Sequence, residues 1–244
     1  MSLTPYQQLQ QVREHYNTIG QHFAETRKKK LWPEILPFLE NIRSGMKVLD
    51  VGCGSGRLLS ELSDKKIKYL GLDFSEVLVK QAKKRFPSRR FWVRDVTDKS
   101  GWRQVGQHKV TICLGVLHHI PDRARQHEVL RQMFLHTKPN GLMILSVWNL
   151  WQLRFWGQHL KQLPGKISHG NLSYLWVPYA VSDGQKIIKK VDRFTKAFLP
   201  GELLRLVKQV GYQVDTFYYA SADKTHLPIW QGRNFCLLAR KRVK

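Results

Sequence analysis

Residues 48–56 read Val48-Leu49-Asp50-Val51-Gly52-Cys53-Gly54-Ser55-Gly56, an apolar strand that ends in an acid and continues into glycines at alternate positions. A strand that turns at once into a helix, with its backbone against a ligand, needs residues that lack a Cβ atom and tolerate positive φ. Gly52, Gly54 and Gly56 meet this need, and residues 57–62 continue with helical apolar spacing. The stretch therefore predicts a ligand-binding loop between a strand and a helix.

A second acid indicates that the ligand carries a nucleoside. Asp73 ends an apolar run at residues 69–72, and doubly wound folds hold ribose hydroxyls with an acid near this position. The dinucleotide-binding pattern would place its third glycine where this chain has Arg57. The spacing therefore favours a nucleoside cofactor other than a dinucleotide.

Alternating strand and helix patterns continue through residue 149. Short apolar strands are predicted at residues 91–95, 110–114 and 142–147, with one helix at 75–82 before the first of them and another at 121–138 before the last. Such units with short loops imply right-handed crossovers and a parallel sheet, which binds ligands beyond the carboxyl ends of its strands. Two final strands, around 214–219 and 235–239, suggest an antiparallel hairpin at the sheet edge.

The chain of 244 residues contains no linker rich in Pro, Gly or Ser, so we expect a single domain. Its expected parts are a helical segment (1–44), a cofactor-binding core (45–149), a substrate-side insertion (150–195) and a C-terminal helix with hairpin (196–244). The insertion has no regular period, and a long irregular loop in a compact domain is usually functional.

The composition indicates a polyanionic partner. Lys and Arg number 41 against 18 Asp and Glu, a formal net charge of +23, which suits a nucleic acid, with a generally basic surface as the alternative. The three cysteines have no paired spacing and are expected to be free thiols. The absence of a long apolar run or a secretory pattern predicts a cytoplasmic protein without a membrane segment.

Four successive motifs carry a family resemblance: Asp50 with the glycine loop, Asp73, Asp95, and residues 114–120 (Leu-Gly-Val-Leu-His-His-Ile). Together they resemble class I S-adenosylmethionine-dependent methyltransferases. Residues 16–27 followed by Trp32-Pro33, together with 175–179 and 193–203, are similar to the tRNA wobble-uridine carboxymethyl methyltransferases. Such enzymes methylate the carboxylate of 5-carboxymethyluridine at the wobble position of tRNA.

The resemblance implies a Rossmann-like α/β fold, with a seven-stranded, mostly parallel sheet and a C-terminal antiparallel hairpin. It implies S-adenosylmethionine as cofactor, tRNA as partner and, as in eukaryotic relatives, a small activator protein. In this interpretation Asp73 accepts the ribose hydroxyls, Asp95 and Val96 meet the adenine, and Arg27 pairs with the cofactor carboxylate. The full set of expected cofactor contacts is Arg27, Asp50, Gly52, Cys53, Gly54, Gly56, Asp73, Phe74, Asp95, Val96, Leu114 and Gly115.

The acceptor side is expected to be oriented by Tyr16, His118, Trp148, Asn149 and Arg193. Since His118 and His119 are adjacent, at most one should face the substrate, and zinc partners at suitable spacing are missing, so no metal is expected. An ionised carboxylate acceptor needs no general base.

Some residues depart from the family pattern: the aromatic stretch before the Gly-Glu-Leu segment reads Asp192–Phe198, the Val-Pro motif ends in Tyr179, and the insertion is longer. Two alternatives therefore stay open. One is a small-molecule methyltransferase of the same fold. The other is a catalytically silent, methyltransferase-like RNA-binding module.

Overall fold

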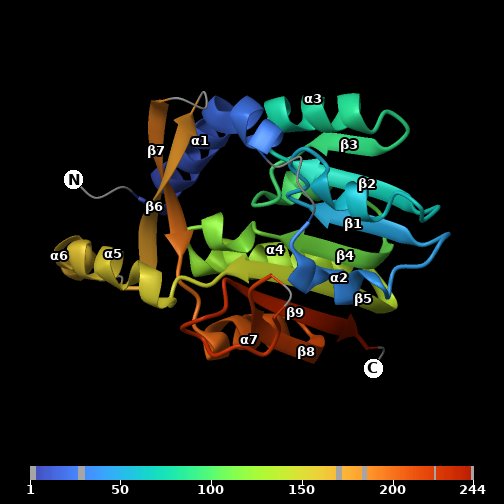
Figure 1. The fold of residues 1–244 in the computed structure, drawn as a ribbon. Helices are drawn as coiled ribbons and strands as arrows, with labels where there is room; N and C mark the ends of the chain where they lie inside the picture. The colour runs from blue at the N-terminus through green and yellow to red at the C-terminus, as the bar shows by residue number, and fades with distance from the viewer. Residues whose placement is uncertain (1–3, 27–30, 169–171, 183–185, 223, 243–244) are drawn as a thin grey trace.

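The centre of the protein is a seven-stranded β-sheet, seen in the computed structural model of the chain (Figure 1). The structure describes residues 4–26, 31–168, 172–182, 186–222 and 224–242. In spatial order the strands are β3 (Arg90–Val93), β2 (Lys68–Asp73), β1 (Lys47–Val51), β4 (His108–Leu114), β5 (Thr137–Trp148), β9 (Asn234–Lys241) and β8 (Tyr212–Ala220). The first five strands in this order, β3, β2, β1, β4 and β5, pair in parallel. Strand β9 is antiparallel to both of its neighbours, β5 and β8. The predicted sheet and its C-terminal hairpin are confirmed.

Helices cover both faces of this sheet (Figure 1). The α-helices are α1 (Pro5–Thr26), α2 (Leu36–Leu39), α3 (Glu76–Arg85), α4 (Arg123–His136), α5 (Trp156–Lys161), α6 (Leu163–Ser168) and α7 (Pro200–Gln209). The 3-10 helices are η1 (Pro33–Ile35), η2 (Arg57–Glu61), η3 (Lys99–Trp102), η4 (Leu117–His119) and η5 (Leu153–Phe155). The helix predicted after the glycine loop is thus a short 3-10 helix.

The buried core is divided between the two faces by the alternation of side chains along each strand. In β1, Leu49 and Val51 join a cluster that includes Leu130 of α4 and Leu206 of α7. The intervening Val48 joins a second cluster on the other face, which is covered by α2, η2 and α3. A strand covered on both faces is typical of parallel sheets, and this accounts for the nearly continuous apolar runs in the sequence.

Two predicted helices carry the expected features. The hydroxyl of Ser75 accepts a hydrogen bond from the Leu78 amide at 3.4 Å and caps α3. In α1, Val12, Tyr16 and Ile19 are buried on one side, as their spacing indicated. The side chain of Phe23, predicted on the same stripe, lies outside the described residues.

The insertion is more regular than predicted. After α5 and α6, strands β6 (Tyr174–Ser182) and β7 (Ile187–Lys196) form a separate antiparallel hairpin. Figure 1 shows this hairpin standing across the carboxyl ends of the parallel strands, between α1 and α5. The sequence concealed β6 because Pro178 interrupts it, and a two-stranded sheet tolerates a proline where a central strand would not.

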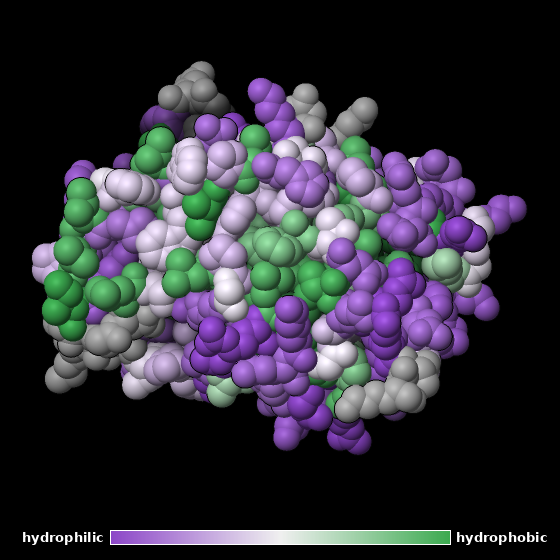
Figure 2. Space-filling model, turned by 90° about the horizontal axis from the view of Figure 1, so that it is seen from below, coloured by the Kyte–Doolittle hydropathy of each residue, from purple (hydrophilic) through white to green (hydrophobic). Residues whose placement is uncertain are grey.

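The α5–α6 end of the insertion exposes apolar side chains. Leu153, Trp156, Leu160 and Ile167 are all more than half exposed, and Figure 2 shows hydrophobic side chains gathered at the left end of the molecule, where these helices lie. No helix in the described ranges has the length and apolarity needed to cross a bilayer.

A buried polar contact joins η1, near the start of the chain, to the C-terminal hairpin. Asn234 at the start of β9 donates to Glu34 Oε1 at 2.6 Å, and the Tyr218 hydroxyl donates to the Glu34 carbonyl oxygen at 2.8 Å. Glu34 is 3% exposed, and a buried carboxylate needs such partners to offset its lost hydration. The contact therefore fixes η1 against the C-terminal hairpin.

We predict that Asn234→Leu lowers the free energy of unfolding by about 1–3 kcal/mol, because it leaves the buried Glu34 carboxylate without this donor. Glu34→Gln keeps an acceptor for Asn234 and should change stability by less than about 1 kcal/mol. Urea unfolding measures both variants. Equal losses in the two would contradict this role of the contact.

Candidate active site

The glycine loop after β1 has the backbone conformation that its residues predict. Gly52, Gly54 and Gly56 have φ values of 75°, 52° and 76°, and the amides of Gly52 and Cys53 both donate to the Leu72 carbonyl oxygen. A Cβ atom on Gly52 would lie 2.1 Å from Val116 Cγ2, whereas a Cβ on Gly54 would meet nothing within 4 Å. The loop therefore lies against the segment after β4 and leaves open space above Gly54.

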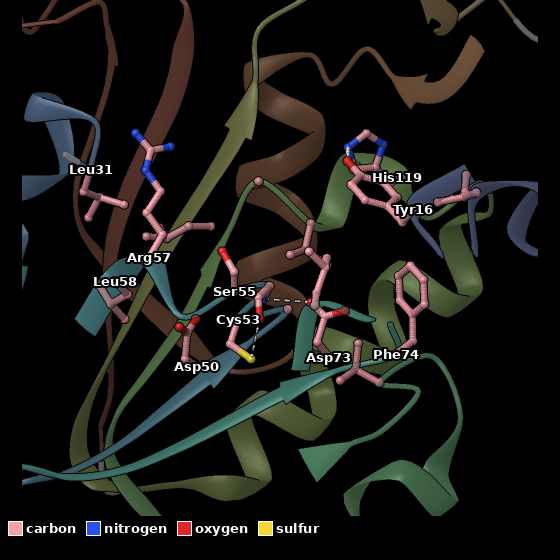
Figure 3. Close-up of a pocket in the computed structure, with 18 of the residues that line it drawn as sticks. Tyr16, Leu31, Asp50, Cys53, Ser55, Arg57, Leu58, Asp73, Phe74 and His119 are labelled. Carbon is pink, nitrogen blue, oxygen red and sulfur yellow. Dashed lines mark hydrogen bonds between the residues drawn. The ribbon is translucent and has the colours of Figure 1, made fainter. Parts of the chain in front are cut away.

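Asp73 holds the loop in place from the end of β2. Its Oδ2 accepts from the Gly54 amide at 2.8 Å, and its Oδ1 accepts from the Ser75 amide at 2.9 Å; Figure 3 shows the first of these bonds. Each carboxylate oxygen keeps capacity for one further donor. Burial raises the pKa of Asp73 to about 6, although both amide bonds act to lower it.

Asp50 lies beside Asp73 in the same cavity. The hydroxyl of Tyr69 donates to its Oδ2 at 2.7 Å. Burial raises the pKa of Asp50 to about 7, and the nearby Asp73 charge adds to this increase. Both acids therefore bind a proton more tightly in the folded chain than in the unfolded chain. Their contribution to stability is present at low pH and is lost as the pH rises through about 6 to 7.

A cavity opens between the glycine loop, the ends of β2 and β4, and α1 (Figure 3). Of the residues predicted to bind cofactor or acceptor, those that line it are Tyr16, Asp50, Gly52, Cys53, Gly54, Asp73, Phe74, Val96, Leu114, Gly115 and Trp148. Further apolar wall comes from Val12 and Leu78. The structure thus brings most of the predicted site together at the carboxyl edge of the sheet.

The side of the cavity near α1 is built on a fixed histidine. The Tyr16 hydroxyl lies 2.9 Å from His119 Nε2, and His119 Nδ1 lies 2.9 Å from the Phe194 carbonyl oxygen. Because a carbonyl can only accept, Nδ1 carries the proton and Nε2 accepts from Tyr16. Burial, followed by the charge of Arg193, lowers the pKa of His119 to about 3. His119 is therefore a neutral, oriented group.

Two residues that were predicted to orient the acceptor are buried and do not line the cavity. His118 is fully buried, and its Nδ1 accepts from the Trp148 amide at 3.2 Å while its ring stacks on the indole at 5.0 Å. Asn149 is also buried; its amide nitrogen donates to the carbonyls of Ile229 and Gly232, and its Oδ1 accepts from the Trp151 amide. Both residues hold Trp148 and the end of β5 in place.

Asp95 is not among the residues that line this cavity. Its carboxylate is paired with Arg13 on one oxygen and with Thr97 on the other, and it lines a neighbouring hollow that shares Arg94 with the cavity. The neighbouring Arg94 and Val96 do line the cavity. The contact between Asp95 and the adenine stays a prediction.

Of the three other predicted residues, two do not line the cavity. Gly56 packs below the loop, where a Cβ atom would lie 3.0 Å from Phe86 Cδ2. Arg193 stacks on Trp148, with its guanidinium carbon 4.8 Å from the ring centroid. Arg27 lies outside the described residues.

The cavity also contains residues that the motif analysis did not place there. They are Leu31, Trp32, Ser55, Arg57, Leu58, Arg94, Val116 and His119, besides Val12 and Leu78. The Arg57 guanidinium carbon lies over the Trp32 indole, 4.8 Å from the ring centroid. The sequence could have indicated Trp32, because the Trp32-Pro33 pair is part of the family resemblance. That His119 rather than His118 lines the cavity depends on the 3-10 turn of η4, which residue spacing does not reveal. The described residues hold no group of three or more His, Cys, Asp or Glu that could bind a metal ion.

Comparison with known proteins identifies the family. Residues 23–242 match the family described as Methyltransferase domain, and the chain belongs to it. A tRNA (carboxymethyluridine(34)-5-O)-methyltransferase of Arabidopsis thaliana is 30% identical over 145 residues, 59% of this chain and 34% of that protein. The protein of the same name from Saccharomyces cerevisiae is 32% identical over 141 residues, 58% of this chain and 49% of that protein. The matched regions thus span about a third to a half of these relatives.

Solved structures confirm the class I methyltransferase fold. A SAM-dependent methyltransferase from Methanosarcina mazei superposes with a TM-score of 0.66 at 17% identity, over 88% of this chain and 100% of that chain. A structure of a complex between the Haloferax volcanii Trm112 methyltransferase activator and a methyltransferase gives 0.65 at 16% identity, over 93% and 98% of the two chains. At these identities the likeness concerns the fold.

We predict that Gly52→Ala lowers the free energy of unfolding by about 3 kcal/mol, since it combines an unfavourable φ with a clash against Val116. Gly54→Ala is the matched control: its φ is also positive, but its Cβ meets open space, so the loss should be about 1 kcal/mol. Denaturant unfolding measures both. Similar losses in the two variants would contradict close packing at Gly52, and adding Val116→Ala should recover part of the Gly52→Ala loss.

Proposed function

We propose that this domain uses S-adenosylmethionine to methylate the carboxylate of a 5-carboxymethyl-type wobble uridine in tRNA. The observation that carries the substrate is the similarity to two curated relatives named for this reaction, each at 30% identity or more over more than half of the chain. The excess of positive charge, +23 overall, supports a tRNA partner. A tRNA substrate in turn favours the cytoplasm as its location.

The cavity suits the proposed cofactor. Asp73 has acceptor capacity left for a ribose diol, Gly54 leaves room for a ligand to approach the backbone, and Val96, Leu114 and Phe74 supply apolar surface for a purine. The cofactor supplies a methyl group on a sulfonium: a carboxylate oxygen forms the O–C bond as the S–C bond breaks, and the electron pair stays on sulfur as a neutral thioether.

The acceptor side of the cavity suits a nucleophile that is already ionised. His119 has both ring nitrogens engaged and a strongly lowered pKa, so it is poorly placed to remove a proton. A carboxylate at neutral pH requires no such removal, and alignment and exclusion of water then account for the rate. Tyr16 and Trp148 are the cavity residues that we assign to acceptor alignment.

A small activator protein is a candidate partner. One structure of the same fold is a methyltransferase in complex with its activator. Assays should therefore be run with and without a small activator protein from the same source.

We predict that the protein with S-adenosylmethionine converts 5-carboxymethyluridine in tRNA to its methyl ester, detected by mass spectrometry of digested nucleosides. Asp73→Ala should abolish conversion because it removes the cofactor clamp, while Asp64→Ala, which removes an exposed loop acid, should leave it unchanged. Methylation of small acids but not of tRNA would favour the small-molecule alternative. A protein that binds tRNA but no cofactor would favour the silent RNA-binding module.

We predict that the affinity for S-adenosylhomocysteine falls about tenfold between pH 7 and pH 5, because the ionised form of Asp73 binds the ribose and its pKa is about 6. Calorimetry measures this change. Asp73→Asn should bind weakly with an almost flat pH response, whereas Asp50→Asn should keep the slope. A pH-independent affinity in the wild type would contradict the role given to Asp73.

A further inference from the structure

A second hollow adjoins the cofactor cavity at Trp148. It shares Trp32 and Trp148 with that cavity, and its walls also include Phe155 and the guanidinium groups of Arg154, Arg193 and Arg233. We call it the arginine groove. A ligand seated here would therefore lie next to the first cavity, in contact with the two indole rings that line both.

Arg193 is the unusual member of this groove. It is 4% exposed, yet its Nε and Nη1 have no hydrogen-bond partner among the described residues. The guanidinium is held between the rings of Trp148 and Tyr179, at 4.8 and 4.9 Å. Stacking fixes its position but leaves its N–H donors unused, which is costly for a buried cation unless an anion completes the site.

The charges around the groove are not balanced from within. The wall contributes three guanidinium groups and one carboxylate, that of Glu34, whose Oε1 is held by Asn234. None of the ion pairs formed by the described residues includes Arg154, Arg193 or Arg233. The neighbouring Asp192 is exposed, on the opposite face of β7.

A second buried polar atom without a partner among the described residues indicates that the ligand carries a hydrogen-bond donor. Gln158 lines the groove, and its Oε1 is buried without a hydrogen-bond partner among the described residues. An amide of this kind suits the N3–H of a uracil ring. The groove thus combines aromatic surface, an unsatisfied acceptor and unsatisfied cationic donors, the features with which proteins bind an unstacked, anionic nucleotide.

We propose that the arginine groove binds the acceptor nucleotide, with Arg193 paired to its carboxylate and Arg154 and Arg233 paired to backbone phosphate. This inference rests on the proposed function for the identity of the carboxylate. Trp148, which lines both hollows, orients the uracil ring where they adjoin, so that the carboxylate beside Arg193 reaches the cofactor cavity. Arg193 acts through direct contact with the substrate.

The test uses the full chain and two anticodon stem–loop RNAs that differ in one group: a 5-carboxymethyluridine and its neutral amide, 5-carbamoylmethyluridine. Wild-type protein should bind the carboxylate RNA about tenfold or more tightly than the amide RNA. Arg193→Met should lose this preference and lower kcat/KM for methylation about 100-fold, while its affinity for S-adenosylhomocysteine stays within about twofold. Arg193→Lys should restore part of the preference.

Arg154→Gln and Arg233→Gln provide a second measurement that does not depend on a buried residue. Each should raise KM, leave kcat unchanged and reduce the slope of log affinity against log salt by about one. Lys138→Gln, which removes an exposed cation at the opposite end of β5, is the control and should change neither quantity.

Equal binding of the two RNAs by the wild type, or an unchanged preference in Arg193→Met, overturns the groove assignment. An Arg154→Gln/Arg233→Gln variant with unaltered KM and salt slope also overturns it. Failure of the proposed function gives a different pattern: the wild type still prefers the carboxylate RNA but transfers no methyl group to it. That pattern would support the groove while rejecting the reaction.

Discussion

The site depends on one carboxylate. Asp73 ends β2 and accepts a hydrogen bond from the glycine loop of β1 and another from the first residue of the turn into α3. These two bonds join the carboxyl ends of neighbouring strands and hold the loop in its left-handed conformation. The same burial that makes the bonds strong also raises the pKa of Asp73, so the group that shapes the cavity is sensitive to mild acid.

The rest of the architecture divides two tasks between hollows that adjoin at Trp148. One hollow is formed by the carboxyl edge of the sheet, the glycine loop and the acids Asp50 and Asp73. The other is a groove built largely from the insertion and the C-terminal hairpin, with η1 in its wall. His118 and Asn149, both buried, fix the end of β5, so the Trp148 indole at its tip is held in one place where the two hollows adjoin. Residues far apart in the chain thereby meet at one aromatic ring.

The sequence predicts the parts of this site that follow from strand geometry. Parallel strands end at one edge, so Asp50, Gly52, Gly54 and Asp73 had to meet there, and they do. Asp95, His118 and Asn149 do not line the cavity, because the direction of a side chain in the residues that follow a strand is not fixed by a short motif. The β6–β7 hairpin was missed because its pairing is stabilised by packing against α1 and η4 rather than by a clear alternation. Arg193 was predicted as an acceptor residue, but its burial between two rings is a tertiary feature.

The stacked guanidinium of Arg193 has a consequence for turnover. Esterification removes the negative charge of the carboxylate. Under this assignment, the methylated uridine no longer forms an ion pair with Arg193. The methylated tRNA would then dissociate faster than the unmodified tRNA. Methylated tRNA in the cell would therefore compete only weakly for the protein. A single cation held between aromatic rings would thus distinguish tRNA that is not yet methylated from tRNA that already is.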